Sequence, residues 1–262
     1  MRRRALPFLL GAVSGALGGL MGVGGGIVLV PLLVHLVRME QHEAQGTSLA
    51  FIIITALVAA IPYYSHERLD LTLALCLAAG AVPGVMLGSR LAAATSGSRL
   101  RVAFGLVLLT TAVRLMAAPP DGYAGAGPWP AAVNVILGLA VGVLAGLLGV
   151  GGGTLLVPIL VLGQGIDQHT AQGISLLMIV PVGIVGVLSY ARRGRLTVRA
   201  LPTLLAGGAI GALAGSLLAH RTVAPTLSRL FALFLFAVAA QMIFRRPRGN
   251  VPASAESQGG NS

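Results

Sequence analysis

Two stretches of this chain have nearly the same sequence and lie about 127 residues apart. The first copy comprises residues 19–26 (GLMGVGGG), 29–31 (LVP) and 41–49 (QHEAQGTSL), and the second comprises 146–153 (GLLGVGGG), 156–158 (LVP) and 168–176 (QHTAQGISL). One offset aligns all three segments without a gap, and about 22 of the 39 positions from Gly11 to Leu49 are identical, which is far beyond chance. We therefore expect two related halves.

The composition indicates an integral membrane protein. The chain has 262 residues, of which 56% are hydrophobic and only 10% charged, and its mean hydropathy is +0.90. A soluble domain carries roughly 25% charged residues, so this chain cannot cover a globular surface with polar groups. Uncharged runs such as 49–60, 71–87 and 174–188 approach the roughly 20 residues that a helix needs to cross a bilayer.

The basic side chains, 18 in number, are all arginine, and the net charge is +11. They gather between apolar runs, at residues 2–4, 99–101, 192–199 and 245–248. This distribution is typical of membrane topology and lipid-headgroup contact, and no nucleic-acid-binding motif accompanies it, so the expected partner is the bilayer and not a nucleic acid. The single cysteine, Cys76, can form no internal disulfide.

The fold expected from these patterns is all-α. Each half has a glycine-broken apolar stretch followed by three cleaner spans, in the first half at 6–37, 44–63, 71–93 and 100–117, and in the second at 131–163, 171–190, 198–218 and 226–244. The predicted division is a first repeat (1–117), a Pro/Gly-rich connector (118–130), a second repeat (131–246) and a disordered tail (247–262). The basic, apolar start resembles a signal peptide, but its alignment with an internal segment predicts that it is retained.

The number of crossings made by the broken stretch decides how the halves are related. If it crosses once, each half has four spans and the repeats are parallel. If the chain turns back or splits at 22–26, the repeats are inverted. With both termini in the cytoplasm, the inverted arrangement puts about 14 of the 18 arginines inside, against about 12 for the parallel one, so we favour inverted repeats of half-helices or re-entrant hairpins.

The glycine triplets are the first candidate site. Gly24, Gly25 and Gly26, like Gly151, Gly152 and Gly153, allow positive φ and close backbone approach. A break within hydrocarbon is tolerated only against protein or a wet cavity, and a helix that begins after it directs free N–H groups into that cavity. The alternative is that these glycines only permit tight helix packing, which we expect for Gly80, Gly84 and Gly88.

The second candidate set stands before a long span in each half, and it comprises His42, Gln45, Thr47 and Ser48 in the first and His169, Gln172 and Ser175 in the second. The hydroxyls and amides can donate to an oxyanion, or they can simply cap helices. The histidines can titrate near neutral pH and couple transport to protons, or they can be merely solvated at span ends. Tyr63 and Tyr190 are interpreted as interfacial anchors.

Acidic residues are absent from the predicted spans, which argues against a proton relay or cation site deep in the bilayer. No nucleophile–base pair or metal-ligand motif is present, so no enzyme activity, cofactor or metal is expected. Duplicated, glycine-broken apolar segments instead favour a transporter whose small anionic substrate binds between the repeats.

The duplicated motif GVGGG-x3-VP, followed by A-x-GTSL, resembles the sulfite exporter TauE/SafE family, also called toluene sulfonate uptake permeases. The resemblance extends to about Phe244. It implies a bacterial inner-membrane permease for sulfite, sulfonates, sulfoacetate or related anions, without fixing cargo, direction or oligomeric state. Ile174 replaces the threonine of the first copy, which makes Thr47 and Ser48 the better candidates for the hydroxyl site.

Three functions stay open at this point. The favoured one is alternating access, in which the halves rock around an anion held near the middle of the bilayer. A passive anion channel would use the same donors. A membrane assembly subunit that binds partner helices through small-residue faces is the third.

Overall fold

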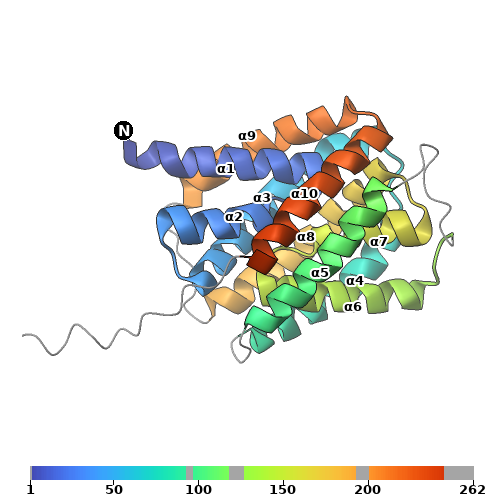
Figure 1. Cartoon of the computed structure of the whole chain (residues 1–262), viewed down its shortest axis with the longest axis horizontal. Helices are drawn as coiled ribbons and strands as arrows, with labels where there is room; N and C mark the ends of the chain where they lie inside the picture. Colours follow the sequence, from blue (N-terminus) through green and yellow to red (C-terminus); the bar gives the residue numbers. More distant parts are fainter. Residues whose placement is uncertain (1, 93–96, 118–126, 193–200, 245–262) are drawn as a thin grey trace, which may run out of the picture.

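The structure, a computed structural model, describes residues 2–92, 97–117, 127–192 and 201–244, and every regular element among them is helical (Figure 1). The first repeat contains α1 (Arg2–Met21), α2 (Gly26–Leu32), the π-helical η1 (Leu33–Val37), α3 (Gln41–His66), α4 (Leu71–Leu91) and α5 (Gly97–Met116). The second contains α6 (Ala131–Leu148), α7 (Gly153–Ile159), η2 (Leu160–Gln164), α8 (Gln168–Ala191), α9 (Leu201–His220) and α10 (Ala224–Phe244). The all-α prediction is confirmed.

Within the described ranges, six helices are long and apolar enough to cross a membrane: α3, α4, α6, α8, α9 and α10. Large apolar side chains such as Val113 of α5 and Leu233 of α10 are exposed, as lipid contact requires. The predicted disordered tail (247–262) and most of the predicted connector, 118–126, lie outside the described residues.

The central helices α3 and α8 are repeat counterparts, and they run antiparallel. Near the end of α3, the Tyr63 hydroxyl lies 2.8 Å from the Gln172 amide oxygen at the start of α8. Near the end of α8, the Tyr190 hydroxyl lies 3.3 Å from the Gln45 amide oxygen at the start of α3. Inverted repeats predict this arrangement, whereas parallel repeats would point both helices the same way.

The outer helices pack across the repeats. Helix α1 lies beside α9 (Figure 1), and α4 contacts α6 in the same manner. A Cβ on Gly15 would lie 2.2 Å from Gly208 O, and one on Gly84 would lie 2.4 Å from Leu139 O, so small residues let both backbone pairs approach closely. The packing role expected for Gly80, Gly84 and Gly88 is confirmed.

Each glycine break turns the chain back on itself. Beyond Met21 the chain returns along α1, so that a Cβ on Gly25 would lie 2.2 Å from Ser14 O, in the middle of α1. Helix α2 then runs back toward the first turn of α3. Its Pro31 lacks an N–H, and the chain continues past it as π-helical η1; Pro158 precedes η2 in the same way.

Because of this helix order, the two ends of the molecule differ in the number of arginines that they contain. The arginine-rich end contains Arg38, Arg90 and Arg192, together with the first turns of α1 and α5. The opposite end contains Arg68, Arg114, Arg221 and Arg229. Helix α1 begins, and α10 ends, at the arginine-rich end, so α2 returns to that end and α7 returns to the opposite one.

Candidate functional site

The two glycine breaks meet in the interior of the protein, between α3 and α8. A Cβ on Gly26 would lie 3.2 Å from Val150 O, and one on Gly153 would lie 3.0 Å from Val23 Cα. The Thr55 hydroxyl, from the middle of α3, donates to Gly24 O at 2.7 Å. The meeting point is therefore halfway along the central helices, and it contains Gly24, Gly25 and Gly26 together with Gly151, Gly152 and Gly153.

Backbone conformation explains why the breaks consist of glycine. Gly24 and Gly25 have φ of 71° and 80°, and Gly151 and Gly152 have φ of 87° and 82°. Only glycine adopts this left-handed region without a steric penalty. Gly26 and Gly153, which begin α2 and α7, have ordinary φ but no room for a side chain, because a Cβ there would lie 2.8 Å from Ser48 Oγ and 2.7 Å from Ser175 Oγ, respectively.

The serines thus lie directly against the glycine breaks, while their hydroxyls differ in bonding. Ser48 Oγ donates to Gly26 O at 3.3 Å, whereas Ser175 Oγ is buried without a hydrogen-bond partner. Thr47 Oγ1 is likewise buried and unpaired. The capping interpretation of these residues is wrong, because α3 begins at Gln41 and α8 at Gln168, and the N-cap positions are Glu40 and Asp167.

The glutamines of the predicted site are tied to the two tyrosines. Tyr63 and Tyr190 are 0% and 1% exposed, so their interpretation as interfacial anchors is wrong. Besides the amide oxygens of Gln172 and Gln45, their hydroxyls approach Gly19 O at 3.1 Å and Gly146 O at 3.0 Å. Each tyrosine therefore joins the last turn of α1 or α6, just before a glycine break, to the central helices α3 and α8.

Removing the hydrogen bonds of the Tyr63 hydroxyl should lower the stability of the fold by a measurable amount. We expect Tyr63→Phe to lower the free energy of unfolding by about 1–2 kcal/mol, because buried carbonyl and amide oxygens lose a donor while the ring packing is kept. Thermal unfolding in detergent checks this, and Tyr64→Phe, at the exposed neighbouring residue, serves as the control. Equal melting temperatures for the Tyr63→Phe and Tyr64→Phe variants would refute a structural role for the buried hydroxyl.

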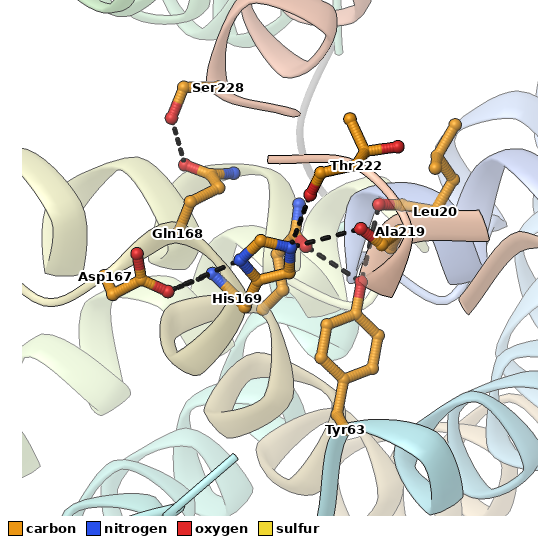
Figure 2. Close-up of polar contacts among 9 residues, drawn as sticks. Leu20, Tyr63, Asp167, Gln168, His169, Ala219, Thr222 and Ser228 are labelled. Carbon is orange, nitrogen blue, oxygen red and sulfur yellow. Dashed lines mark hydrogen bonds and ion pairs between the residues drawn. The ribbon is translucent and has the colours of Figure 1, made fainter. Parts of the chain in front are cut away.

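The structure does not bring His42 and His169 to the breaks. They lie at opposite ends, one turn before Gln45 and Gln172. His42 Nδ1 is 3.2 Å from Gln45 Oε1, at the arginine-rich end. At the opposite end His169 contacts Ala219 O and Thr222 O, both at 3.1 Å, and the Asp167 carboxylate at 3.5 Å (Figure 2). The hydrogen bond with His169 holds the pKa of the Asp167 carboxyl below its usual value.

Sequence reasoning missed several polar residues near this centre. Thr55 binds Gly24 O, and the hydroxyls of Ser14 and Thr154 are buried without hydrogen-bond partners. Thr154 follows Gly153 directly, where the first repeat has Ile27. Comparison of the two copies position by position could have flagged this difference. His220, whose ring contacts Tyr63 edge-on and His66 in a tilted arrangement with centroids 4.5 and 4.7 Å away, carried no sequence signal.

A cavity of about 90 Å³ lies beside α2, between the arginine-rich end and the residues that adjoin the breaks. Its walls come from α2, η1, the first residue of α3 and the ends of α6 and α10. Ile27 and Val150 line it next to the glycine breaks, while the exposed side chains of His35 and Gln41 line it toward the surface. A solute can therefore come close to the centre from the arginine-rich end.

In the second repeat, other side chains cover the surface that matches this cavity. The Trp129 ring packs on η2, where a Cβ on Gly163 would lie 2.9 Å from it. Next to it, Gln164 Nε2 donates to Asn134 Oδ1 at 2.9 Å, and both side chains are buried. The first repeat has Leu36 and Val37 at the positions of Gly163 and Gln164, both exposed. The two halves thus differ in access although their breaks match.

Near the glycine breaks, the described residues of the central helices α3 and α8 carry no formal charge. Helix α3 carries no acidic or basic residue from Ala44 to Ser65, and α8 carries none from Thr170 to Ala191. The groups available to a ligand are neutral donors, namely hydroxyls, amides and the first backbone N–H groups after each break. Such an arrangement can hold a small anion by hydrogen bonds.

The comparisons with known proteins identify a family and several similar proteins. The profile described as Sulfite exporter TauE/SafE matches residues 6–254. The probable membrane transporter protein YunE of Bacillus subtilis is 27% identical over 261 residues, which cover 90% of this chain and 96% of the relative. A probable membrane transporter protein of Xylella fastidiosa is 29% identical over 242 residues, covering 90% and 93%. No solved structure matches. This chain therefore belongs to the sulfite exporter TauE/SafE family and is a multi-pass membrane transporter, not an enzyme.

Proposed function

We propose that this transporter is a permease for small sulfur-containing or organic anions, such as sulfite, sulfonates or sulfoacetate, and that the anion binds where the glycine breaks meet. The observation that carries the proposal is the meeting itself, because two backbone breaks and their neighbouring hydroxyls lie face to face halfway along the central helices. The proposed site comprises Gly24, Gly25, Gly26, Gln45, Thr47, Ser48, Gly151, Gly152, Gly153, Gln172 and Ser175, with His42 and His169 at its two approaches.

The chemistry of the centre supports an anion over a cation. Carboxylates, which would bind a cation or relay protons, are absent from the described core of α3 and α8. Hydroxyl and amide donors stabilise negative charge without a formal positive charge, because hydrogen bonds to an ionised group are stronger than neutral ones. The family description supplies the expectation of a sulfur oxyanion.

Alternating access is the transport mechanism we propose. The cavity beside α2 leads to the arginine-rich end, whereas Trp129 and the Gln164–Asn134 pair cover the matched surface beside α7. In the opposite state the first repeat would close over its break and the second would open. Inverted repeats provide such paired states, because each half can adopt the other's conformation. A passive channel is the second candidate, and an assembly subunit the third.

Reconstitution separates these three functions. Purified protein in liposomes is tested for uptake of labelled sulfite and methanesulfonate under an imposed pH gradient or membrane potential. Accumulation of the anion above its equilibrium level excludes a channel. Dissipative flux alone supports the channel. The absence of flux for every anion, with the protein correctly folded, would refute transport of these anions.

We also propose that the protein lies in the bacterial inner membrane with its arginine-rich end in the cytoplasm. In a Cys76→Ala background, a cysteine at Glu40 is then shielded from an impermeant maleimide in intact spheroplasts, and a cysteine at Arg68 is labelled. Permeabilisation should expose the first site as well. The reverse pattern would show the opposite orientation, and labelling of both sites in intact spheroplasts would contradict a crossing by α3.

A further inference from the structure

The two repeats differ in how their buried donors are used. In the first repeat, Ser48 Oγ is bonded to Gly26 O, and Gln45 Nε2 donates to Leu147 O at 3.3 Å. The matched atoms of the second repeat, Ser175 Oγ and Gln172 Nε2, have no partner, although both side chains are 0% exposed. The equivalent side chains therefore do not have equivalent roles.

A third buried donor without a partner lies on α7. Thr154 is 0% exposed, and its hydroxyl has no hydrogen-bond partner. It follows Gly153, which lies against Ser175 Oγ, and Gln172 lies one helical turn before Ser175 on α8. The Tyr63 hydroxyl, which also contacts Leu20 O (Figure 2), holds the oxygen of the Gln172 amide and leaves the NH₂ group unpaired.

Buried polar groups are nearly always hydrogen-bonded, so the three unpaired donors on α7 and α8 require an explanation. A packing role does not explain them, because alanine and valine would fill similar space without an unpaired polar group. A bound ligand that accepts hydrogen bonds would satisfy them. The first repeat also has two unpaired hydroxyls, those of Ser14 and Thr47. At the position that matches Thr154, however, the first repeat has Ile27, which has no side-chain donor.

The described segments that carry the three donors hold no cationic side chain. Among the described residues, neither α7 with η2 nor α8 beyond His169 carries an arginine or histidine. The cost of transferring an ion from water into a low-dielectric site rises with the square of its charge, so a dianion loses about four times as much hydration energy as a monoanion of equal size. Neutral hydroxyl and amide donors can compensate the hydration energy lost by a monoanion much more easily than the hydration energy lost by a dianion.

We infer that Thr154, Gln172 and Ser175 form the anion-selecting subsite, and that it accepts singly charged oxyanions such as a sulfonate or hydrogen sulfite and rejects dianions such as sulfate. This inference rests on the proposed function and specifies which half of the centre recognises the substrate. It also reverses the sequence-based preference for the Thr47 and Ser48 pair.

Anion charge provides the first test. In proteoliposomes, methanesulfonate, which has one charge throughout the neutral range, should enter at least about 100-fold faster than sulfate. Sulfite flux at fixed total sulfite should fall as pH rises through neutrality, since hydrogen sulfite is then converted to the dianion, while methanesulfonate flux stays constant. Comparable sulfate flux, or sulfite flux that rises with the dianion, would overturn the inference while leaving the permease proposal intact.

Substitutions provide the second test. Ser175→Ala and Thr154→Val should each raise the half-saturation concentration for the transported anion about tenfold or more, because a hydrogen bond to a charged ligand is lost. Ser175→Thr and Thr154→Ser, which keep the hydroxyl, should largely restore it. Ser48→Ala and Thr47→Val, at the matched site of the first repeat, should raise it less than Ser175→Ala and Thr154→Val do. Ser189→Ala, whose hydroxyl binds Val185 O on the same helix α8, is the matched control.

The outcomes separate the two claims. If Thr47→Val weakens binding more than Thr154→Val and Ser175→Ala, the subsite lies in the first repeat, and the inference is wrong although the protein is still a permease. If the unsubstituted protein carries none of the three anions, the proposed function itself fails. Elution of each variant as a single species in size-exclusion chromatography shows that a raised half-saturation concentration does not come from misfolding.

Discussion

Gly25→Ala should abolish transport and leave little correctly folded protein. The residue has φ of 80°, which costs a non-glycine residue about 1–2 kcal/mol. The added Cβ would also lie 2.2 Å from Ser14 O, a backbone atom in the middle of α1, so α1 or the break must move. We expect a total destabilisation of more than about 3 kcal/mol, because backbone strain and steric overlap act together.

Two other glycines separate these causes. Gly127 has φ of 78° but no neighbour within 4 Å of an added Cβ, so Gly127→Ala should lower stability by only about 1–2 kcal/mol. Gly24, with φ of 71° and its nearest neighbour at 3.3 Å, should give an intermediate result. Thermal unfolding in detergent and sulfite flux measure the series. If Gly25→Ala behaves like Gly127→Ala, the close return of the chain along α1 is incorrect.

Gly138→Leu should prevent α4 and α6 from packing. A Cβ at Gly138 would already lie 2.1 Å from Leu77 O, and leucine adds three more carbons. Without a hydrophobic driving force between helices in lipid, close backbone contact is a main source of association, so its loss should destabilise the fold by at least about 3 kcal/mol. Ala140→Leu introduces the same side chain two residues later, at an exposed position, and should be tolerated.

The measurement compares the two variants in the same membrane background. The fraction of each variant that elutes as a single folded species after detergent extraction is expected to fall severalfold for Gly138→Leu and to remain near the unsubstituted level for Ala140→Leu. Equal behaviour would mean that α4 and α6 do not pack through this glycine, or that the exposed face of α6 is buried in an assembly.

Much of the fold could be predicted from sequence because the controlling features are local or duplicated. Hydropathy located the helices of both halves, and one offset aligned their breaks. The arginine distribution favoured inverted repeats, which agrees with the antiparallel course of α3 and α8. Sequence also selected Ser48 and Ser175, which lie against Gly26 and Gly153. Whether these residues bind substrate stays a prediction that the variants above can test.

The errors have a physical origin as well. Polar residues near the end of an apolar run look alike whether they face headgroups or the protein interior, so Tyr63 and Tyr190 were interpreted as anchors although both are buried. The capping interpretation of Thr47 failed because α3 starts two turns earlier than the apolar run suggests. Thr154 was overlooked because an isolated threonine within an apolar run is unremarkable until its neighbour Gly153 is known to lie against Ser175 Oγ.

The packing of α1 on α9 has a consequence for biogenesis. The N-terminus of a nascent chain is synthesised first, yet α9, the helix that packs on α1, begins only at residue 201. Likewise, α4 is synthesised before its packing partner α6. The first repeat therefore leaves the translocon with glycine-lined grooves still vacant, and the final three-dimensional arrangement forms only when synthesis is nearly complete. Neither half expressed alone should be stable, whereas residues 1–117 and 127–262 produced as two polypeptides in one cell should associate.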